Sequence, residues 1–304
     1  MMIKSIRHIS PDKIIAIDIE TVRIGDTFST IPESFQEAWE YKNKHEGEIP
    51  DNEEMEKLWL KQASLYAEFS KVCAVSLAFI SKGVLRVKNY ASYDEKMILL
   101  ALSKDLQKFE GYRLCAHTGK YFDYPFLCKR YVINSIAIPD VLDSSNLKPW
   151  EQLNLDTNEI WKSFGTGPGS SLVALCAALG IETPKVDLVG DEVGKAYYNN
   201  ELVRISKYCN LDAVACMNVF LKFKGEPTYL FSDVTYVNEG ELLPNFLDKL
   251  YQTKQITAED FAIIKSFAAN LDPKHTDFLQ KMLTAAVAVG KQVSLDNKNF
   301  IEQL

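Results

Sequence analysis

The sequence lacks any apolar run long enough to cross a membrane. Its longest stretch without charged residues, Ser163–Ile181, opens with the turn-forming residues Ser-Phe-Gly-Thr-Gly-Pro-Gly-Ser-Ser, so its apolar part is too short for a bilayer. Near the N-terminus, the apolar run Ile14–Ile17 ends at Asp18 and is too short for the core of a signal peptide. We therefore expect no membrane association and a cytoplasmic location.

Patterns for several common chemistries are also missing. The six cysteines form no Cys-x-x-Cys pair, and the four histidines show no zinc-ligand spacing. Buried free thiols in a reducing cytosol are the default interpretation, and a zinc site is the alternative. There is no Gly-x-Ser-x-Gly motif, and Gly165–Gly169 lacks the full phosphate-loop or dinucleotide pattern, so we interpret it as a turn.

Basic residues are scarce relative to acidic ones. The chain has 34 Lys and Arg against 41 Asp and Glu, which gives a net charge of −7. This balance disfavours a protein that coats nucleic acid, because phosphate contacts need Lys and Arg. A protein that holds a single phosphate through metal ions is still compatible with it. The 304 residues, 47% hydrophobic and 25% charged, indicate a globular chain of one large or two smaller domains.

The pattern of apolar residues predicts an α/β domain followed by helices. Strands are expected over 13–18 and 113–116, with a hairpin over 72–80 and 83–90. Helices are expected within the Glu-rich segment 32–69 and over 94–109, 125–134, 170–179 and 201–223, and later near 242–251, 258–269 and 276–289. We expect one domain over 1–225, with a helical insertion at about 32–69. Residues 226–304 would form a C-terminal helical extension of unknown role.

Two carboxylates, Asp18 and Glu20, follow the first predicted strand at a spacing of two. Their side chains should project from the same face of the sheet, where a divalent cation such as Mg²⁺ or Mn²⁺ would offset the repulsion. Asp51 and Glu53 repeat the spacing, which shows how weak the pattern is alone. The second pair lies at a predicted helix N-terminus, where acidic residues are favoured anyway. Only the first pair follows a buried strand.

A second motif runs from His117 to Leu127 and reads His-Thr-Gly-Lys-Tyr-Phe-Asp-Tyr-Pro-Phe-Leu. A short strand enters a glycine-containing loop, and Asp123 falls at or near the N-cap of the next helix. Taken alone, Asp123 would be interpreted as a helix cap and His117 as an ordinary loop histidine.

A third motif, Tyr208-Cys-Asn-Leu-Asp212, lies inside the long helix expected over 201–223. Residues four apart share a helix face, so the phenol and the carboxylate should point the same way. Tyr90 to Asp94 and Tyr229 to Asp233 have the same spacing. Of the three pairs, only Tyr208–Asp212 lies well within a predicted helix. A solvent-facing pair is the alternative interpretation.

In this order, the three motifs resemble those of the 3′–5′ exonucleases with an RNase H-like fold. The position five residues before the last Asp, where one subgroup has His, is Lys207 here, whereas Tyr208 stands four before it. The chain therefore resembles the tyrosine-type (DEDDy) subgroup. The resemblance covers roughly residues 10–225 and is strongest to stand-alone bacterial exonucleases related to the proofreading domain of family-B DNA polymerases. It implies a mixed β-sheet flanked by helices. Thr118 departs from the family, which usually has Asn after this His.

The resemblance also implies a two-metal mechanism with two Mg²⁺ or Mn²⁺ ions. Asp18 would bridge the metals, Glu20 and Asp212 would complete the site that activates the water, and Asp123 would hold the second metal. Tyr208 would orient the attacking water. Thr21, His117, Lys120 and Phe122 would contact the terminal nucleotide or the scissile region. The nearby cations expected to meet phosphate are Lys120, Lys129, Arg130, Lys148 and Lys207.

The resemblance thus implies hydrolysis of phosphodiester bonds from the 3′ end of DNA, single-stranded above all, in repair or proofreading. Two alternatives stay open: a 3′–5′ exoribonuclease, and a catalytically silent accessory protein that binds nucleic acid. The apolar positions of the C-terminal extension suggest packing on the first domain, with a protein partner as the alternative.

Overall fold

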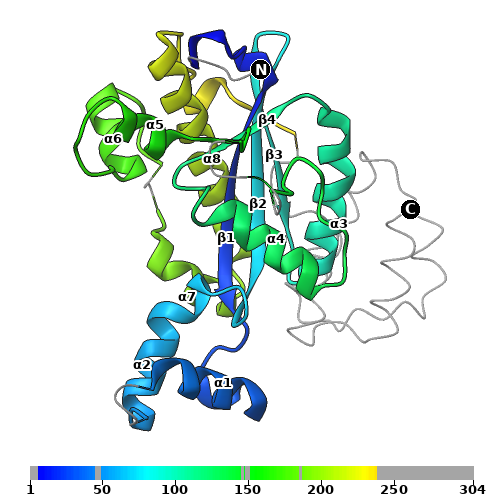
Figure 1. Cartoon of the computed structure of the whole chain (residues 1–304), viewed down its shortest axis with the longest axis vertical. Helices are drawn as coiled ribbons and strands as arrows, with labels where there is room; N and C mark the ends of the chain where they lie inside the picture. The colour runs from blue at the N-terminus through cyan, green and yellow to red at the C-terminus, as the bar shows by residue number, and fades with distance from the viewer. Residues whose placement is uncertain (1–5, 45–48, 145–146, 148–150, 185–186, 238–304) are drawn as a thin grey trace, which may run out of the picture.

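The computed structural model describes residues 6–44, 49–144, 147, 151–184 and 187–237. It has a six-stranded mixed sheet in the order β5-β4-β1-β2-β3-β6, flanked by helices (Figure 1). Strand β2 is antiparallel to β1 and β3, whereas β4 is parallel to β1, as expected for an RNase H-like fold. The strands are β1 (Ile14–Arg23), β2 (Ser70–Ser81), β3 (Val84–Ala91), β4 (Arg113–Ala116), β5 (Leu155–Asp156) and β6 (Thr235–Tyr236).

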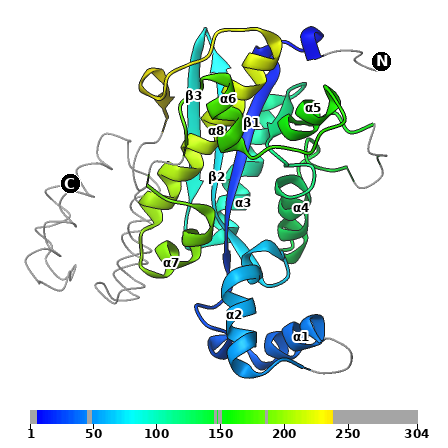
Figure 2. The ribbon, with the colours of Figure 1, turned by 90° about the vertical axis from the view of Figure 1, so that its left-hand side faces the viewer.

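Helices cover both faces of the sheet, and Figure 2 shows α4 and α8 on opposite sides of β1. The helices are α1 (Glu33–Asn43), α2 (Asn52–Gln62), α3 (Glu95–Leu106), α4 (Asp123–Ile133), α5 (Thr157–Ser163), α6 (Leu172–Leu179), α7 (Val193–Tyr198) and α8 (Leu202–Lys224). Within the described ranges, none of these combines the length and apolar character needed to span a bilayer.

The alternation of side chains along β1 divides the core into two layers. Ile15, Ile17 and Ile19 pack with α3 and α4, whereas Ile14 and Ala16 pack with α8 on the other face. Asp18 and Glu20 continue the second series and therefore lie on the α8 face. The alternation of one buried strand thus decides which helix meets the two carboxylates.

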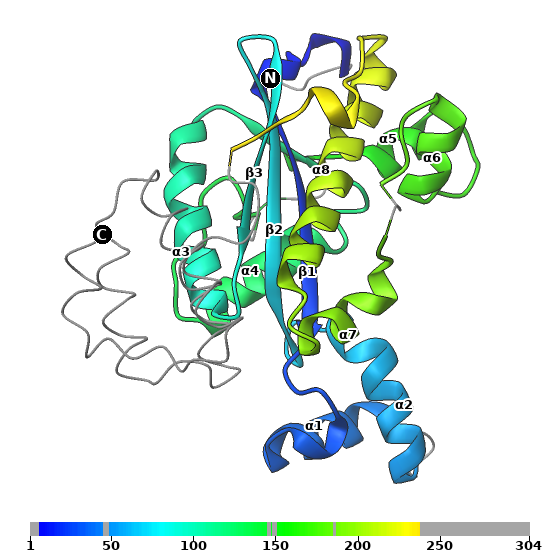
Figure 3. The same cartoon turned by 180° about the vertical axis from the view of Figure 1, so that it is seen from behind.

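The predicted hairpin and helical insertion are both present. Lys82 and Gly83, with φ of 54° and 75°, form the two-residue turn between β2 and β3. In the insertion, α1 and α2 enclose an aromatic cluster in which Trp39 lies 5.3 Å from Trp59 and 4.9 Å from Phe69, measured between ring centroids. Figure 3 shows this helical pair projecting beyond the sheet, near the end of β1.

Several short elements were not predicted. Strands β5 and β6 have two residues each, and α5 and α7 have seven and six, too short for periodicity to reveal. Strand β6 pairs in parallel with β3, so the sheet includes residues beyond 225. The helices predicted near 242–251, 258–269 and 276–289 lie outside the described residues.

Candidate active site

Strand β1 provides the first two carboxylates from its interior rather than from its end. The prediction that β1 stops at Asp18 is wrong, because the strand continues to Arg23 through its pairing with β2. On the opposite edge, β4 pairs only with Ile14–Ala16 and ends at Ala116. The early end of β4 leaves room beside Asp18 and Glu20 for the loop that follows it.

A β-bulge lies directly opposite Glu20. Glu20 pairs with Ala74 and Thr21 pairs with Val72, so Cys73 is the extra residue on β2. The Cys73 thiol donates to the Glu20 carbonyl oxygen at 3.4 Å. Bulges increase the local twist and redirect side chains, and they occur often next to functional sites. Here the bulge sets the direction of β1 where its two carboxylates project.

Asp123 reaches the same place from the other face of the sheet. It is the first residue of α4, and its buried carboxylate accepts hydrogen bonds from the backbone N–H groups of Asp123 itself and Ile19. Burial raises the pKa of Asp123 to about 7, and the charges of Asp156 and Asp212 add to this shift, while the backbone hydrogen bonds oppose it. The bond to Ile19 places this carboxylate beside β1, between Asp18 and Glu20 in sequence.

The loop before Asp123 has little freedom. A Cβ on Gly119 would lie 2.2 Å from the Ala116 Cβ, so only glycine fits this close approach. Thr118 has a φ of 67°, a left-handed conformation that a β-branched residue adopts only at a cost. Asn, the residue that the sequence resemblance leads us to expect here, tolerates this conformation better.

Asp156, which lies outside the three sequence motifs, fixes this loop. Its buried carboxylate accepts hydrogen bonds from the backbone N–H groups of Thr118 at 3.1 Å and Lys120 at 3.2 Å. It also caps α5 by accepting from the N–H groups of Asn158 and Glu159. The sequence signal was present, since Asp156-Thr-Asn-Glu159 has the spacing of a helix capping box.

The third motif faces the site and not the solvent. Tyr208 and Asp212 on α8 are both buried, and the Tyr208 hydroxyl donates to the Asp212 carboxylate. Burial raises the pKa of Tyr208, and the charges of Asp212 and Glu20 raise it further. The phenol therefore stays protonated and acts as a hydrogen-bond donor.

Buried polar bonds fix the rotation of α8 on the sheet. Ser76 on β2 donates to Asn210 at 2.8 Å, and Ser206 donates to Asn89 on β3 at 2.7 Å. Asn89 in turn donates to Ser76 at 2.8 Å. Because Ser76 pairs with Asp18 in the β1–β2 register, this network aligns α8 with β1 at the site.

The charges of three other carboxylates act on Asp18. Burial raises the pKa of Asp18 well above its usual range, and the charges of Asp212, Glu20 and Asp123 raise it further, in that order. One oxygen of Asp18, Oδ2, is buried and has no hydrogen-bond partner. A divalent cation would satisfy that oxygen and offset the repulsion, so the donor set fits Mg²⁺ or Mn²⁺.

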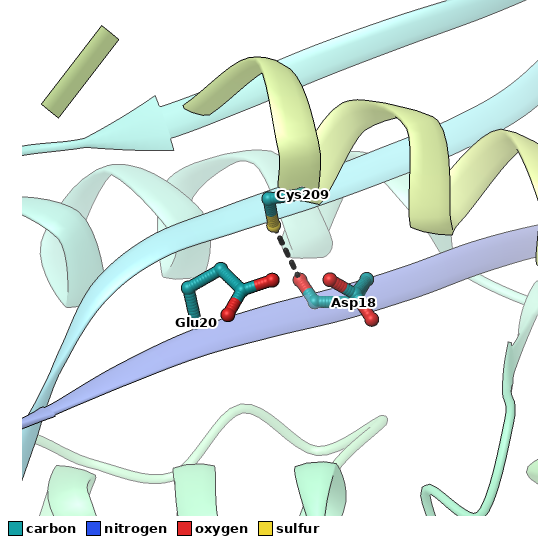
Figure 4. A group of neighbouring side chains, drawn as sticks. All are labelled: Asp18, Glu20 and Cys209. Atoms are coloured by element: carbon teal, nitrogen blue, oxygen red, sulfur yellow. Dashed lines mark hydrogen bonds between the residues drawn. The ribbon is translucent and has the colours of Figure 1, made fainter. Parts of the chain in front are cut away.

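Figure 4 shows how a thiol joins this group. Asp18 and Glu20 project from β1, and the Cys209 thiol from α8 donates to the Asp18 backbone oxygen at 3.4 Å. One potential ligand atom from each of the three residues lies within 4.8 Å of the others. The sequence alone predicts only a buried thiol at Cys209. All six cysteines of the chain are free.

The predicted substrate contacts already have partners inside the protein. The Thr21 hydroxyl donates to the Ser64 carbonyl oxygen at 2.8 Å, and Lys120 forms a 2.7 Å ion pair with Glu159. The remaining two, His117 and Phe122, lie on the loop before α4. Contact of these four residues with a nucleotide stays a prediction.

The two residues of that loop have defined contacts. The His117 ring nitrogens bond to Thr157 Oγ1 at 2.9 Å and to the Ser170 carbonyl oxygen at 2.8 Å, and burial lowers the His117 pKa. The Phe122 ring packs 5.2 Å from that of Phe126. His117 thus ties the end of β4 to the first residue of α5 and to the segment before α6.

The structure corrects one of the predicted phosphate contacts. Arg130 is buried and forms a bidentate ion pair with Glu95, so the prediction that it meets phosphate is wrong. Lys129 and Lys207 are exposed, and Lys148 lies outside the described residues. A cation on the apolar face of an amphipathic helix could have signalled this, since Arg130 falls among Phe126, Leu127 and Tyr131.

Comparison with known proteins identifies the family of the chain. Residues 63–263 match the family described as "Predicted 3'-5' exonuclease related to the exonuclease domain of PolB". The chain belongs to this family. The matched residues include Asp123, Tyr208 and Asp212, whereas Asp18 and Glu20 precede them. No curated protein matches the chain.

Ninety chains of solved structures match as well. One is the family B DNA polymerase from the hyperthermophilic archaeon Pyrobaculum calidifontis, with 12% sequence identity and a TM-score of 0.46. The match covers 69% of this chain and 24% of the polymerase chain, so the chain spans about a quarter of that protein's length.

Proposed function

We propose that this exonuclease-family protein removes nucleotides from the 3′ end of DNA, single-stranded above all, with the help of two Mg²⁺ or Mn²⁺ ions. The observation that carries the proposal is that the charges of Asp212, Glu20 and Asp123 all act on Asp18, which lies beside Glu20 on β1 and has one buried oxygen without a hydrogen-bond partner. Four carboxylates placed together raise one another's pKa and cost stability, so a cation that binds them is the physical reason for keeping them.

The proposal assigns each residue a role. Asp18 would serve both ions, Glu20 and Asp212 would complete the site that activates the water, and Asp123 would help to hold the second ion. Bound there, divalent cations would stabilise the charge on the attacking and leaving oxygens of the phosphodiester. The Tyr208 hydroxyl, a donor held next to Asp212, would orient the attacking water. Its raised pKa supports a role as donor rather than base.

The loop before α4 and the net charge of the chain bear on the rest of the proposal. Asp156 and Gly119 would keep the loop before α4 in one conformation, and thereby hold Asp123 in place. The acidic balance of the chain supports a weak, metal-dependent hold on one strand end rather than coating of duplexes. A role in repair or proofreading and a cytoplasmic location belong to the proposal as well. So does a C-terminal helical extension, which would begin after β6 rather than at residue 226 because β6 belongs to the sheet.

One assay tests the proposal. The protein is incubated with 5′-labelled single-stranded DNA and with RNA of the same sequence, in Mg²⁺, Mn²⁺ or EDTA, and products are resolved by length. A ladder that shortens from the 3′ end in metal and not in EDTA is expected for DNA. A ladder on RNA alone would identify an exoribonuclease. Metal-dependent binding of the oligonucleotide without cleavage would identify the accessory protein, and both results would overturn the proposal.

A further inference from the structure

The buried ion pair between Glu95 and Arg130 links the two sides of the candidate site. Glu95 is the first residue of α3, and its Oε1 accepts from Arg130 Nε at 2.8 Å while its Oε2 accepts from Arg130 Nη2 at 2.6 Å. Both side chains are more than nine-tenths buried. Arg130 lies on α4, two turns after Asp123, or about 10 Å along the helix axis.

The pair also holds the β-bulge opposite Glu20. Glu95 Oε1 accepts from the backbone N–H of Val72 at 2.7 Å, and Val72 is the β2 residue that pairs with Thr21. The next residue, Cys73, is the bulged one, and its thiol bonds to the Glu20 carbonyl oxygen. The same carboxylate therefore contacts the helix that begins at Asp123 and the strand that shapes Glu20.

A third contact reaches the turn before β2. Arg130 Nη1 donates to the Ala67 carbonyl oxygen at 2.6 Å, and three residues earlier the Ser64 carbonyl accepts from the Thr21 hydroxyl. The turn is thus fixed to α4 at one end and to β1 at the other. Asn134, at the end of α4, adds a 2.8 Å bond to Glu95 Oε2. Glu95 Oε1 and Arg130 Nη1 thus reach the two segments that contact β1 beside Glu20 and Thr21.

Stability alone does not explain such a pair. Apolar side chains of similar volume often stabilise a core as well as a buried ion pair does, because desolvation offsets the attraction. Apolar packing is non-directional, however, and would let α4 slide or rotate on the sheet. Bidentate hydrogen bonds fix both distance and angle. Metal ligands need that control, since their distances vary by only about 0.2 Å in real sites.

We propose that Glu95 and Arg130 are positioning residues that fix Asp123 relative to Asp18 and Glu20 and thereby set the affinity for divalent cations. This inference rests on the proposed function. It assigns a role to two residues that contact neither the carboxylates nor the expected substrate.

The chain offers a matched control on the same helix. Asp105, near the end of α3, is also a buried carboxylate, and it accepts from Lys108 at 2.6 Å and from the Tyr90 hydroxyl at 2.8 Å. It anchors α3 to β3, and its bonds do not involve the bulge or α4. Asp105→Asn therefore weakens a comparable buried site without touching the contacts that reach Asp123.

The test measures Mn²⁺ affinity by the paramagnetic resonance of free Mn²⁺, with Asp18→Asn as the baseline for binding elsewhere. Glu95→Gln should raise the Kd for Mn²⁺ about tenfold, as loss of an outer-shell partner commonly does. Arg130→Lys keeps the charge but loses the bidentate geometry, so it should fold and still raise the Kd. Asp105→Asn should leave the Kd unchanged, even where urea unfolding shows an equal loss of stability.

Two results would overturn the proposal: an unchanged Kd in Arg130→Lys, or an equal rise in Kd in Asp105→Asn. Wild-type protein that binds Mn²⁺ but cleaves no oligonucleotide would overturn the proposed function alone, and the Kd comparison would still decide the role of the pair. Wild-type protein with no more Mn²⁺ binding than Asp18→Asn would overturn both.

Discussion

Two regions of the molecule carry the same Asp-x-Glu spacing in opposite surroundings. Asp18 and Glu20 lie within β1, where Asp18 Oδ2 is buried without a partner and neighbouring acids raise the Asp18 pKa. Asp51 is the N-cap of α2 and accepts from the Glu54 N–H, while Glu53 is 81% exposed and pairs with Lys57. The second pair stabilises a helix, and the first destabilises a sheet unless a cation is present. Spacing alone carries little information about function.

The negative charge of the chain is concentrated around the second pair. Residues 32–69, the insertion that carries Asp51 and Glu53, contain ten acidic and four basic residues, which accounts for −6 of the chain's −7. The helices of this insertion project beyond the sheet (Figure 1). The rest of the chain is close to neutral. The acidity that counted against nucleic acid therefore belongs mostly to a segment outside the sheet that carries the site.

The largest effect should come from exchanging one acid in each pair for its amide. If the proposed function holds, Asp18→Asn should lower the nuclease rate by at least about a thousandfold, because it would remove the carboxylate proposed to serve both ions. Asp51→Asn should leave the rate unchanged, since Asn also caps a helix. Rates on 5′-labelled single-stranded DNA would check both. Full activity in Asp18→Asn would contradict the assignment of the site.

Variants of the two acid pairs should also differ in stability. Asp18→Asn removes a buried charge from beside three others, so the metal-free protein should need more urea to unfold. Asp51→Ala loses the cap and should cost about 1 kcal/mol. An activity loss with a stability gain in Asp18→Asn, and unchanged activity with a stability loss in Asp51→Ala, would separate the functional pair from the structural one.

The pH dependence of stability should follow the buried carboxylates. The pKa of Asp123 is raised from 3.8 to about 7, so the folded state holds this proton more tightly than the unfolded state. In EDTA, the free energy of unfolding should therefore fall as the pH rises from about 4 to about 7. Mn²⁺ should reduce this fall, because it favours the ionised carboxylates.

Urea unfolding at a series of pH values, with EDTA or Mn²⁺, would measure this dependence. Asp123→Asn should flatten the curve in EDTA, and Asp51→Asn should leave it as in the wild type. An equal slope in Asp123→Asn would show that Asp123 does not contribute.

A smaller effect should follow from a methyl group in the loop before α4. The Cβ in Gly119→Ala would meet the Ala116 Cβ at 2.2 Å, and the resulting shift should move Asp123 and slow cleavage about a hundredfold. Gly167→Ala is the matched control, since a Cβ there meets nothing within 4 Å. Comparable rates for Gly119→Ala and wild type would show that the loop can move without cost to the site.

Features that depend on consecutive residues could be predicted from the sequence. Residues 13–18 predicted β1, and Ser81-Lys82-Gly83 predicted the hairpin turn. The motif order singled out four carboxylates, and their joint role stays a prediction. The end of β1 was missed because Asp18 and Glu20 interrupt the apolar pattern, while β2 continues to pair with the strand. Backbone pairing with a neighbouring strand can therefore keep polar residues in a strand where the apolar pattern has ended.

What could not be predicted depends on residues far apart in the chain. The bulge at Cys73 shows only in the β1–β2 register, and the partner of Arg130 lies 35 residues earlier at Glu95. Asp156 bonds to a loop 36 to 38 residues before it. No local pattern states which distant donor a buried carboxylate accepts from. These contacts nevertheless determine how the predicted ligands are placed.

The smallest effect should distinguish the three Tyr-x-x-x-Asp pairs. Tyr208 donates to Asp212, whereas the Tyr90 hydroxyl bonds to Asp105 and the Tyr229 hydroxyl bonds to the Gly83 carbonyl. Only the first pair meets within its own motif, next to the other carboxylates. Tyr208→Phe should slow cleavage about tenfold, the value of one hydrogen bond to a charged group, and should leave the Kd for Mn²⁺ unchanged.

Tyr229→Phe is the control for this last comparison, because it removes a hydroxyl from the same spacing outside the site. It should leave both the rate and the Kd unchanged. Single-turnover rates on 5′-labelled DNA, with Mn²⁺ well above its Kd, would separate slower cleavage from weaker metal binding. A higher Kd for Mn²⁺ in Tyr208→Phe would mean that the phenol supports Asp212 as a metal ligand. An unchanged rate and Kd would remove Tyr208 from the mechanism and leave the carboxylates to act without it.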